Sequence, residues 1–136
     1  MDNSILNSIK NNAGVNSDDS VFDGEIILHT NSAFMKLRQL GVGPETPFSI
    51  EDDGPEWTDF TEDETILPMV KSYVTLYVRF LFDPPTSSAL ETAMKEQLSE
   101  YEWRLNVESD TYKVEEDEKY ASYFSNSNNE QRDIFE

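Results

Sequence analysis

The sequence predicts a mainly α-helical fold: a small bundle of about four helices, a short β-hairpin or loop excursion near residues 42–60, and an extended C-terminal tail. Three observations lead to this prediction. Apolar residues recur at helical spacing in four stretches, and most glycines and prolines fall between those stretches. The last thirty residues are acidic and poor in aliphatic residues. We therefore divide the chain into a helical adaptor domain, 1–106, and an acidic C-terminal tail or arm, 107–136.

The first two helices are predicted at residues 3–12 and 22–40. In the first, Ile5, Leu6 and Ile9 share one face, and an Ala-Gly pair follows the run. Short polar residues at 16–20 are typical of turns and caps, so we expect them to accept N–H groups at the start of the second helix. Gly41 stands at the C′ position of that helix. Its apolar stripe consists of Phe22, Ile26, Thr30, Ala33, Leu37 and Leu40.

The helical pattern vanishes between residues 42 and 64. Short alternating segments at 48–50 and 57–60 lie among proline and glycine breakers, which predicts either a two-stranded hairpin or a structured loop. Residues 51–64 hold eight acidic side chains and no basic one. Because one small domain can hardly cover both Trp57 and Phe60, we expect this segment to be a contact arm against a neighbouring subunit or ring.

The third helix is predicted at residues 65–82, because Pro68 is tolerated only in a first turn. Apolar residues fill more than half of its wheel, so it should be the central helix. The narrow remainder holds Lys71, Ser72, Thr75 and Arg79.

The fourth helix is predicted from residue 86 to about residue 106, after a proline pair that ends the third. Ser88 and Glu91 fit a capping box. Its inner stripe consists of Leu90, Met94, Gln97, Leu98, Tyr101 and Leu105. Trp103 lies opposite that stripe, which leaves two interpretations: the tail or the first helix covers it, or it belongs to a subunit interface. Arg104 beside it could bond to an acidic group of the adjoining chain.

The tail at 107–136 has too little hydrophobicity to fold alone, so we expect it to be disordered by itself and ordered by a partner. Its spaced apolar residues could occupy pockets of that partner. Together with the residues above, they make the candidate interface set: Trp57, Phe60, Trp103, Arg104, Tyr112, Tyr120, Tyr123, Phe124, Ile134 and Phe135.

The composition argues against several functional classes. The 136 residues carry 28 acidic and 10 basic side chains, a net charge of −18, which disfavours a basic nucleic-acid interface. There is no cysteine, and the single histidine, His29, falls mid-helix, where a packing role is favoured over catalysis. No glycine has the spacing of a calcium or phosphate loop. We expect no enzyme activity, no metal and no cofactor. Neither a signal peptide nor a membrane span is predicted, so we expect the protein to be made and used in the cytoplasm, or to leave by a route other than secretion.

Several segments occur in order across residues 5–106: ILNSIK at 5–10, QLGVGP at 39–44, WTDF at 57–60, VKSYV at 70–74, FDPPTSSA at 82–89 and EWRLN at 102–106. Together they resemble head–tail connector (adaptor) proteins of long-tailed bacteriophages and prophages. FDPPTSSA and EWRLN, in this order, carry most of the specificity. After Asn106 the acidic tail of this chain extends beyond the core of that family.

The resemblance implies a virion structural protein in the neck, assembled in the host cytoplasm as a homo-oligomeric ring, expected to be a dodecamer that matches the portal. Such a ring links the portal protein to the stopper or tail-completion protein and lines the DNA exit channel. Genomic DNA would pass without specific binding, since a negative wall repels phosphate. The charge alone leaves an alternative open: an acidic monomeric module, such as a DNA-mimic inhibitor of a host enzyme.

Overall fold

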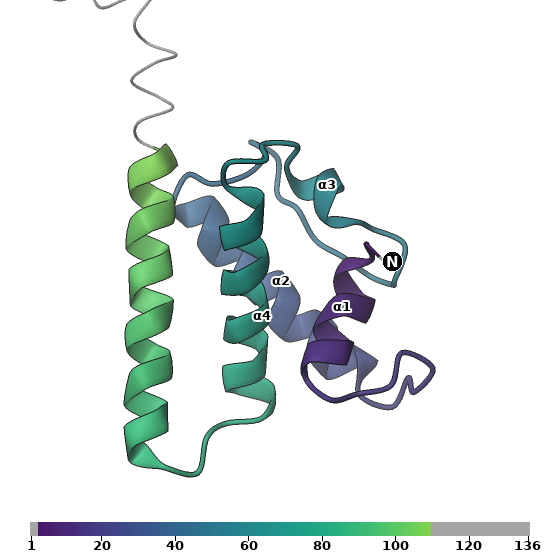
Figure 1. Ribbon diagram of the computed structural model, residues 1–136. Helices are drawn as coiled ribbons and strands as arrows, with labels where there is room; N and C mark the ends of the chain where they lie inside the picture. Colours follow the sequence, from purple (N-terminus) through teal and green to yellow (C-terminus); the bar gives the residue numbers. More distant parts are fainter. Residues whose placement is uncertain (1–2, 110–136) are drawn as a thin grey trace, which may run out of the picture.

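The computed structural model describes residues 3–109, which form helices joined by loops (Figure 1). Four helices carry labels: α1 (Ile5–Asn12), α2 (Asp23–Gln39), α3 (Trp57–Phe60) and α4 (Leu67–Phe82). A further long helix covers residues 88–109 and is called helix 88–109 below; it is drawn in green at the edge of Figure 1. The predicted mainly helical fold is confirmed. No helix in the described part is long and apolar enough to cross a membrane.

Helix α4 is the centre of the bundle, as its apolar wheel predicts. It packs most extensively on α2 and also contacts α1 and α3. Helix 88–109 runs antiparallel beside it, after the loop at 83–87 (Figure 1). The core between α2 and α4 is formed by Ile26, Thr30, Ala33, Phe34 and Leu37 from α2, and by Val70, Tyr73, Val74 and Val78 from α4.

Helix α1 is fastened to α2 by a buried ion pair. The Lys10 side chain is only 1% exposed, and its Nζ lies 2.7 Å from Asp23 Oδ1. The same Nζ donates to the Ser17 carbonyl at 3.1 Å. Since a buried ammonium without a partner would cost several kcal/mol, this pair fixes α1 against the first residue of α2.

The two ends of α2 differ from each other in how they are capped. At the C-terminal end, Gly41 adopts φ 83°, and the Val42 and Gly41 N–H groups donate to the Leu37 and Arg38 carbonyls at 2.9 and 3.0 Å. This is the predicted glycine cap. At the N-terminal end the cap residue, Phe22, offers no side-chain acceptor. The prediction that residues 16–20 cap this helix is therefore wrong: Asn16 and Asp19 instead accept from backbone N–H groups two residues on, forming turns.

Residues 42–56 form a structured loop, and the hairpin alternative is wrong. The segment 57–60 is a single helical turn, α3, in which the Glu56 N–H donates to Asp59 Oδ2 at 2.8 Å. Asn31 of α2 holds the loop: the Ile50 N–H donates to Asn31 Oδ1 at 2.8 Å, and Asn31 Nδ2 donates to the Ile50 carbonyl at 3.0 Å. One side chain thus satisfies both backbone groups of a buried residue that has no partner strand.

The later helix boundaries shift by a few residues. Helix α4 begins at Leu67 with Pro68 in its first turn. Ser87, not Ser88, caps helix 88–109, because the Leu90 N–H donates to Ser87 Oγ at 3.3 Å. Glu91, predicted to complete a capping box, pairs with Lys95 at 3.0 Å instead. Residues 107–109, assigned to the tail, continue the helix. The rest of the tail lies outside the described residues.

Candidate interaction surfaces

Trp57 and Phe60, predicted to need a neighbouring chain to cover them, lie in the core of this chain. They are 3% and 4% exposed. Phe34 of α2 stands between them, with ring centroids 6.3 Å from Trp57 and 4.8 Å from Phe60. Trp57 Nε1 also donates to Ser8 Oγ of α1 at 2.9 Å. The premise of the predicted contact arm is therefore wrong, because α1, α2 and the loop at Phe48 contact these rings within the same chain.

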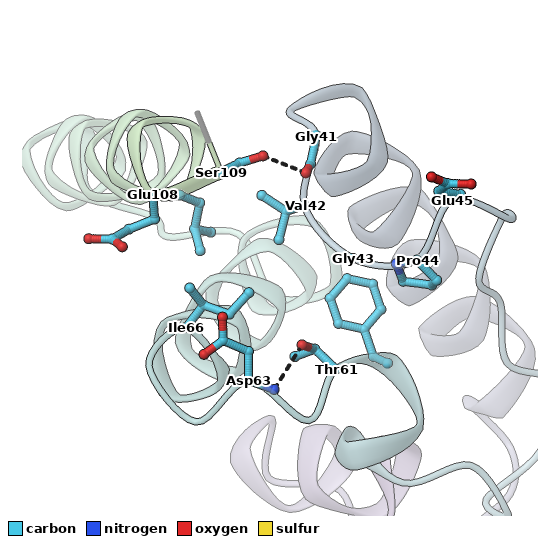
Figure 2. Close-up of a pocket in the computed structure, with 12 residues that line it drawn as sticks. Gly41, Val42, Gly43, Pro44, Glu45, Thr61, Asp63, Ile66, Glu108 and Ser109 are labelled. Carbon is cyan, nitrogen blue, oxygen red and sulfur yellow. Dashed lines mark hydrogen bonds between the residues drawn. The ribbon is translucent and has the colours of Figure 1, made fainter. Parts of the chain in front are cut away.

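The loop after α2 approaches this aromatic cluster closely. Gly43 has φ 96°, and a Cβ there would overlap the Phe60 ring, so only glycine fits. Beside it, a cleft of about 550 Å³ opens between residues 41–45, the segment after α3 and the end of helix 88–109 (Figure 2). Ser109 Oγ donates to the Gly41 carbonyl at 2.6 Å at one wall.

The charged side chains that line this cleft are all acidic. Its described lining includes the carboxylates of Glu45, Asp63 and Glu108 but no histidine, lysine or arginine. The hydroxyl of Thr65 donates to Asp63 at 2.6 Å and holds the pKa of that carboxyl below its usual range.

Trp103 is 66% exposed, the largest apolar side chain on the described surface. Its position opposite the packed face of helix 88–109 confirms the predicted helical phase. Helix α1 does not cover it; any cover from the tail lies outside the described residues, as do all the candidate residues from Tyr112 to Phe135. Val107, one turn further, is also exposed. Arg104 pairs within its own helix, with Glu100 at 2.7 Å.

A second apolar stripe lies on α2 and was not predicted. Val21, Leu28 and Met35 are 80%, 64% and 63% exposed and follow one another at intervals of seven residues. Seven residues are nearly two helical turns, so Leu28 and Met35 share one face, with Val21 just before the helix. The seven-residue spacing can be read from the sequence. It was overlooked because the buried stripe of α2 already accounts for the helical pattern of this segment.

The sequence analysis did not predict the polar contacts that three side chains make between elements of the core: Lys10, Asn31 and Tyr73. Tyr73 is fully buried, and its hydroxyl donates to Glu102 Oε2 at 2.9 Å, joining α4 to helix 88–109. Burial, and secondarily this bond to Glu102, raise the pKa of the Tyr73 phenol above its ordinary value. For Lys10 a signal existed, since it shares a helix face with Ile5, Leu6 and Ile9.

The single histidine has no catalytic setting in the described part of the chain. His29 Nε2 lies 3.5 Å from Glu25 Oε1, one turn earlier on α2. Among residues 3–109, no three side chains of the histidine, cysteine, aspartate or glutamate type gather where they could hold a metal ion. What the described residues offer is therefore surfaces: two exposed apolar stripes and the acidic cleft beside Gly43.

Comparison with known proteins identifies a family. Residues 5–112, which include every described helix, match the family described as phage connector protein. No curated protein and no solved structure matches the chain.

Proposed function

The chain belongs to the phage connector protein family, and from this membership we propose that it forms a homo-oligomeric ring at the head–tail junction of the virion. The ring would join the portal protein to the stopper or tail-completion protein, and its subunits would assemble in the host cytoplasm. We expect twelve subunits, to match the portal.

The observation that supports a ring is the pair of exposed apolar stripes. Trp103 and Val107 lie on helix 88–109, whereas Val21, Leu28 and Met35 lie on or beside α2. Exposed apolar patches mark contacts between proteins, and these two stripes are our candidates for such patches. Two different surfaces that meet head to tail generate a closed ring when the rotation between subunits closes. Tryptophan and methionine are enriched in such interfaces.

The charge supports passage of DNA through the ring. At a net charge of −18 per subunit, a channel wall repels the phosphate backbone, so few contacts would hold the DNA in place. The aromatic residues of the tail, Tyr112, Tyr120, Tyr123 and Phe124 among them, are our candidates for contacts with the portal.

The alternative of an acidic inhibitor that mimics DNA has only the net charge in its favour. It explains neither the family membership nor the two apolar stripes. We also propose that the chain has no enzyme activity, since the described clefts and His29 supply no catalytic arrangement.

The decisive experiment is cryo-electron microscopy of the particle neck with this protein located in it. We expect a single ring below the portal, with helix 88–109 of one subunit against its neighbour. A particle whose neck forms normally after deletion of the gene would overturn the proposal. Co-purification with a host nucleic-acid enzyme instead of portal-containing particles would favour the inhibitor.

A further inference from the structure

A second cleft, of about 520 Å³, is a cationic groove between α4 and helix 88–109, with the end of α1 at its rim. No carboxylate lines it. Its polar walls are made by Lys71, Ser72, Thr75 and Arg79 of α4 and by Gln97 and Tyr101 of helix 88–109. In a chain with 28 acidic side chains, a groove with two cations and no acidic lining residue requires an explanation.

Lys71 and Arg79 lack the carboxylate partners that three other basic residues of the described chain have. Lys10, Lys95 and Arg104 each pair with a carboxylate at 2.7 to 3.0 Å. Within residues 3–109, neither Lys71 nor Arg79 has a carboxylate within ion-pair distance. Lys36 and Arg38 also have no carboxylate within ion-pair distance among residues 3–109. Lys71 and Arg79 differ from them in lining one groove that has no acidic lining residue, which fits an anionic ligand.

We propose that this groove binds the acidic run at residues 115–118 of the same chain, Glu-Glu-Asp-Glu, which lies outside the described residues. The inference concerns the single subunit and stands or falls separately from the connector role. It refines the expectation that the whole tail is disordered alone, because one short run would have an attachment point on the subunit itself.

The reach of the chain fits this assignment. The Tyr73–Glu102 bond sets the register of the two antiparallel helices. At about 1.5 Å per residue, Lys71 then lies about 8 Å back from the level of residue 109, and Arg79 about 20 Å back. A turn of four residues followed by extended chain at about 3.3 Å per residue would bring residue 115 about 7 Å back and residue 118 about 17 Å back. The chain is therefore long enough for the ends of the acidic run to reach the level of the two cations.

The tether matters because exposed ion pairs are individually weak. A free acidic peptide would gain little from two of them. A segment joined to the groove by five residues has an effective concentration in the millimolar range or above, which lets weak pairs hold it. Nucleic acid is the less favoured occupant, because the net charge of −18 repels phosphate. The groove also offers only two cations, fewer than the roughly 6–10 phosphate contacts of proteins that bind DNA firmly.

The test uses the absence of cysteine from the full chain. Asn11→Cys carries a nitroxide beside the groove, next to the lining residue Asn12. At low salt, about 50 mM, we expect the amide signals of residues 115–118 to lose at least about half of their intensity, and to recover at about 1 M salt. K71Q/R79Q should abolish the loss, as should E115Q/D117N/E118Q.

Matched variants control for charge alone. K36Q/R38Q removes two cations outside the groove, and E130Q/D133N/E136Q removes the same three acid types from the far tail; both should keep the loss. Unchanged amide shifts for residues 3–109 verify folding. Absence of broadening in the parent overturns the proposal. So does broadening seen only when isotope-labelled chain is mixed with nitroxide-labelled chain, which would assign the groove to a second copy. Binding of a DNA duplex that needs Lys71 and Arg79, without the tail signal, would assign it to nucleic acid.

Discussion

At the scale of single residues, buried polar side chains determine how the helices meet. Lys10, Asn31 and Tyr73 each reach a specific partner on another segment: Asp23, the Ile50 backbone and Glu102. Hydrophobic packing alone would tolerate small slides between helices, whereas a hydrogen bond has a narrow range of distance and angle. These three contacts therefore define the register that the apolar stripes leave loose.

Tyr73→Phe removes one of these contacts while keeping the packed ring. We expect the free energy of unfolding to fall by about 0.5–1.5 kcal/mol at neutral pH, the usual net value of a hydrogen bond. Chemical denaturation measures it, and Tyr77→Phe, the same change one turn away, is the control. An unchanged midpoint would mean that the Tyr73–Glu102 bond contributes nothing net.

The same residue predicts a response to alkaline pH. Because the pKa of Tyr73 is raised in the folded state, its contribution to stability is complete below the ordinary tyrosine pKa, about 10, and is lost progressively as the pH rises above it. Stability should therefore fall less steeply between about pH 9 and 11 in Tyr73→Phe than in the parent. Equal slopes in the two proteins would contradict this.

The two tryptophans make a matched pair for separating folding from assembly. Trp103→Ala removes an exposed ring, so we expect the unfolding free energy to change by less than about 0.5 kcal/mol. Its incorporation into neck particles should fall at least tenfold, because an interface anchor of this kind contributes about 2 kcal/mol or more. Trp57→Ala, in the core, should instead cost about 3–5 kcal/mol of stability. Normal incorporation of Trp103→Ala would remove that ring from the interface.

At the scale of elements, helices were predictable where one face alone is apolar or where nearly all faces are. The stripes of α1, α2 and α4 gave positions to within two residues. The segment 57–60 was not predictable, because four alternating residues suit a strand as well as a single helical turn, and only contacts with Ser8 and Phe34 decide between them. Burial of Trp57 and Phe60 depends on the same distant contacts, so the sequence pattern could not place these rings inside.

Asn31 allows a test at the level of elements, because its side chain makes the two hydrogen bonds to the Ile50 backbone that a partner strand would otherwise make. Asn31→Ala leaves a buried N–H and carbonyl unpaired, which should cost about 1–3 kcal/mol. The Ile50 amide should also exchange its hydrogen faster than in the parent. Asn11→Ala, at an exposed position of α1, is the control. Unaltered exchange at Ile50 would show that the loop is held by other contacts.

At the scale of the whole molecule, the proposed ring would have to form against the repulsion between subunits of like charge. Subunits with a net charge of −18 repel one another, and salt screens that repulsion within about 10 Å at 0.1 M. If the apolar stripes drive association, the ring should form more readily as salt rises from about 0.05 to 0.5 M. Light scattering or native mass spectrometry measures this. Dissociation with rising salt would mean that ion pairs, not the stripes, hold the subunits together.

The unequal attachment of helix 88–109 to the bundle has a mechanical consequence. Near its end, Leu105 is buried and Asn106 donates to the Leu40 carbonyl at 3.1 Å, whereas at its start Leu90 is 53% exposed. The helix is thus held by specific contacts near its C-terminal end and packs only loosely at its N-terminal end. Opening fluctuations should be largest at residues 90–96, so their amides should exchange faster than those of 100–106. The end near Leu90 can therefore move while the end near Asn106 keeps its contacts with the bundle.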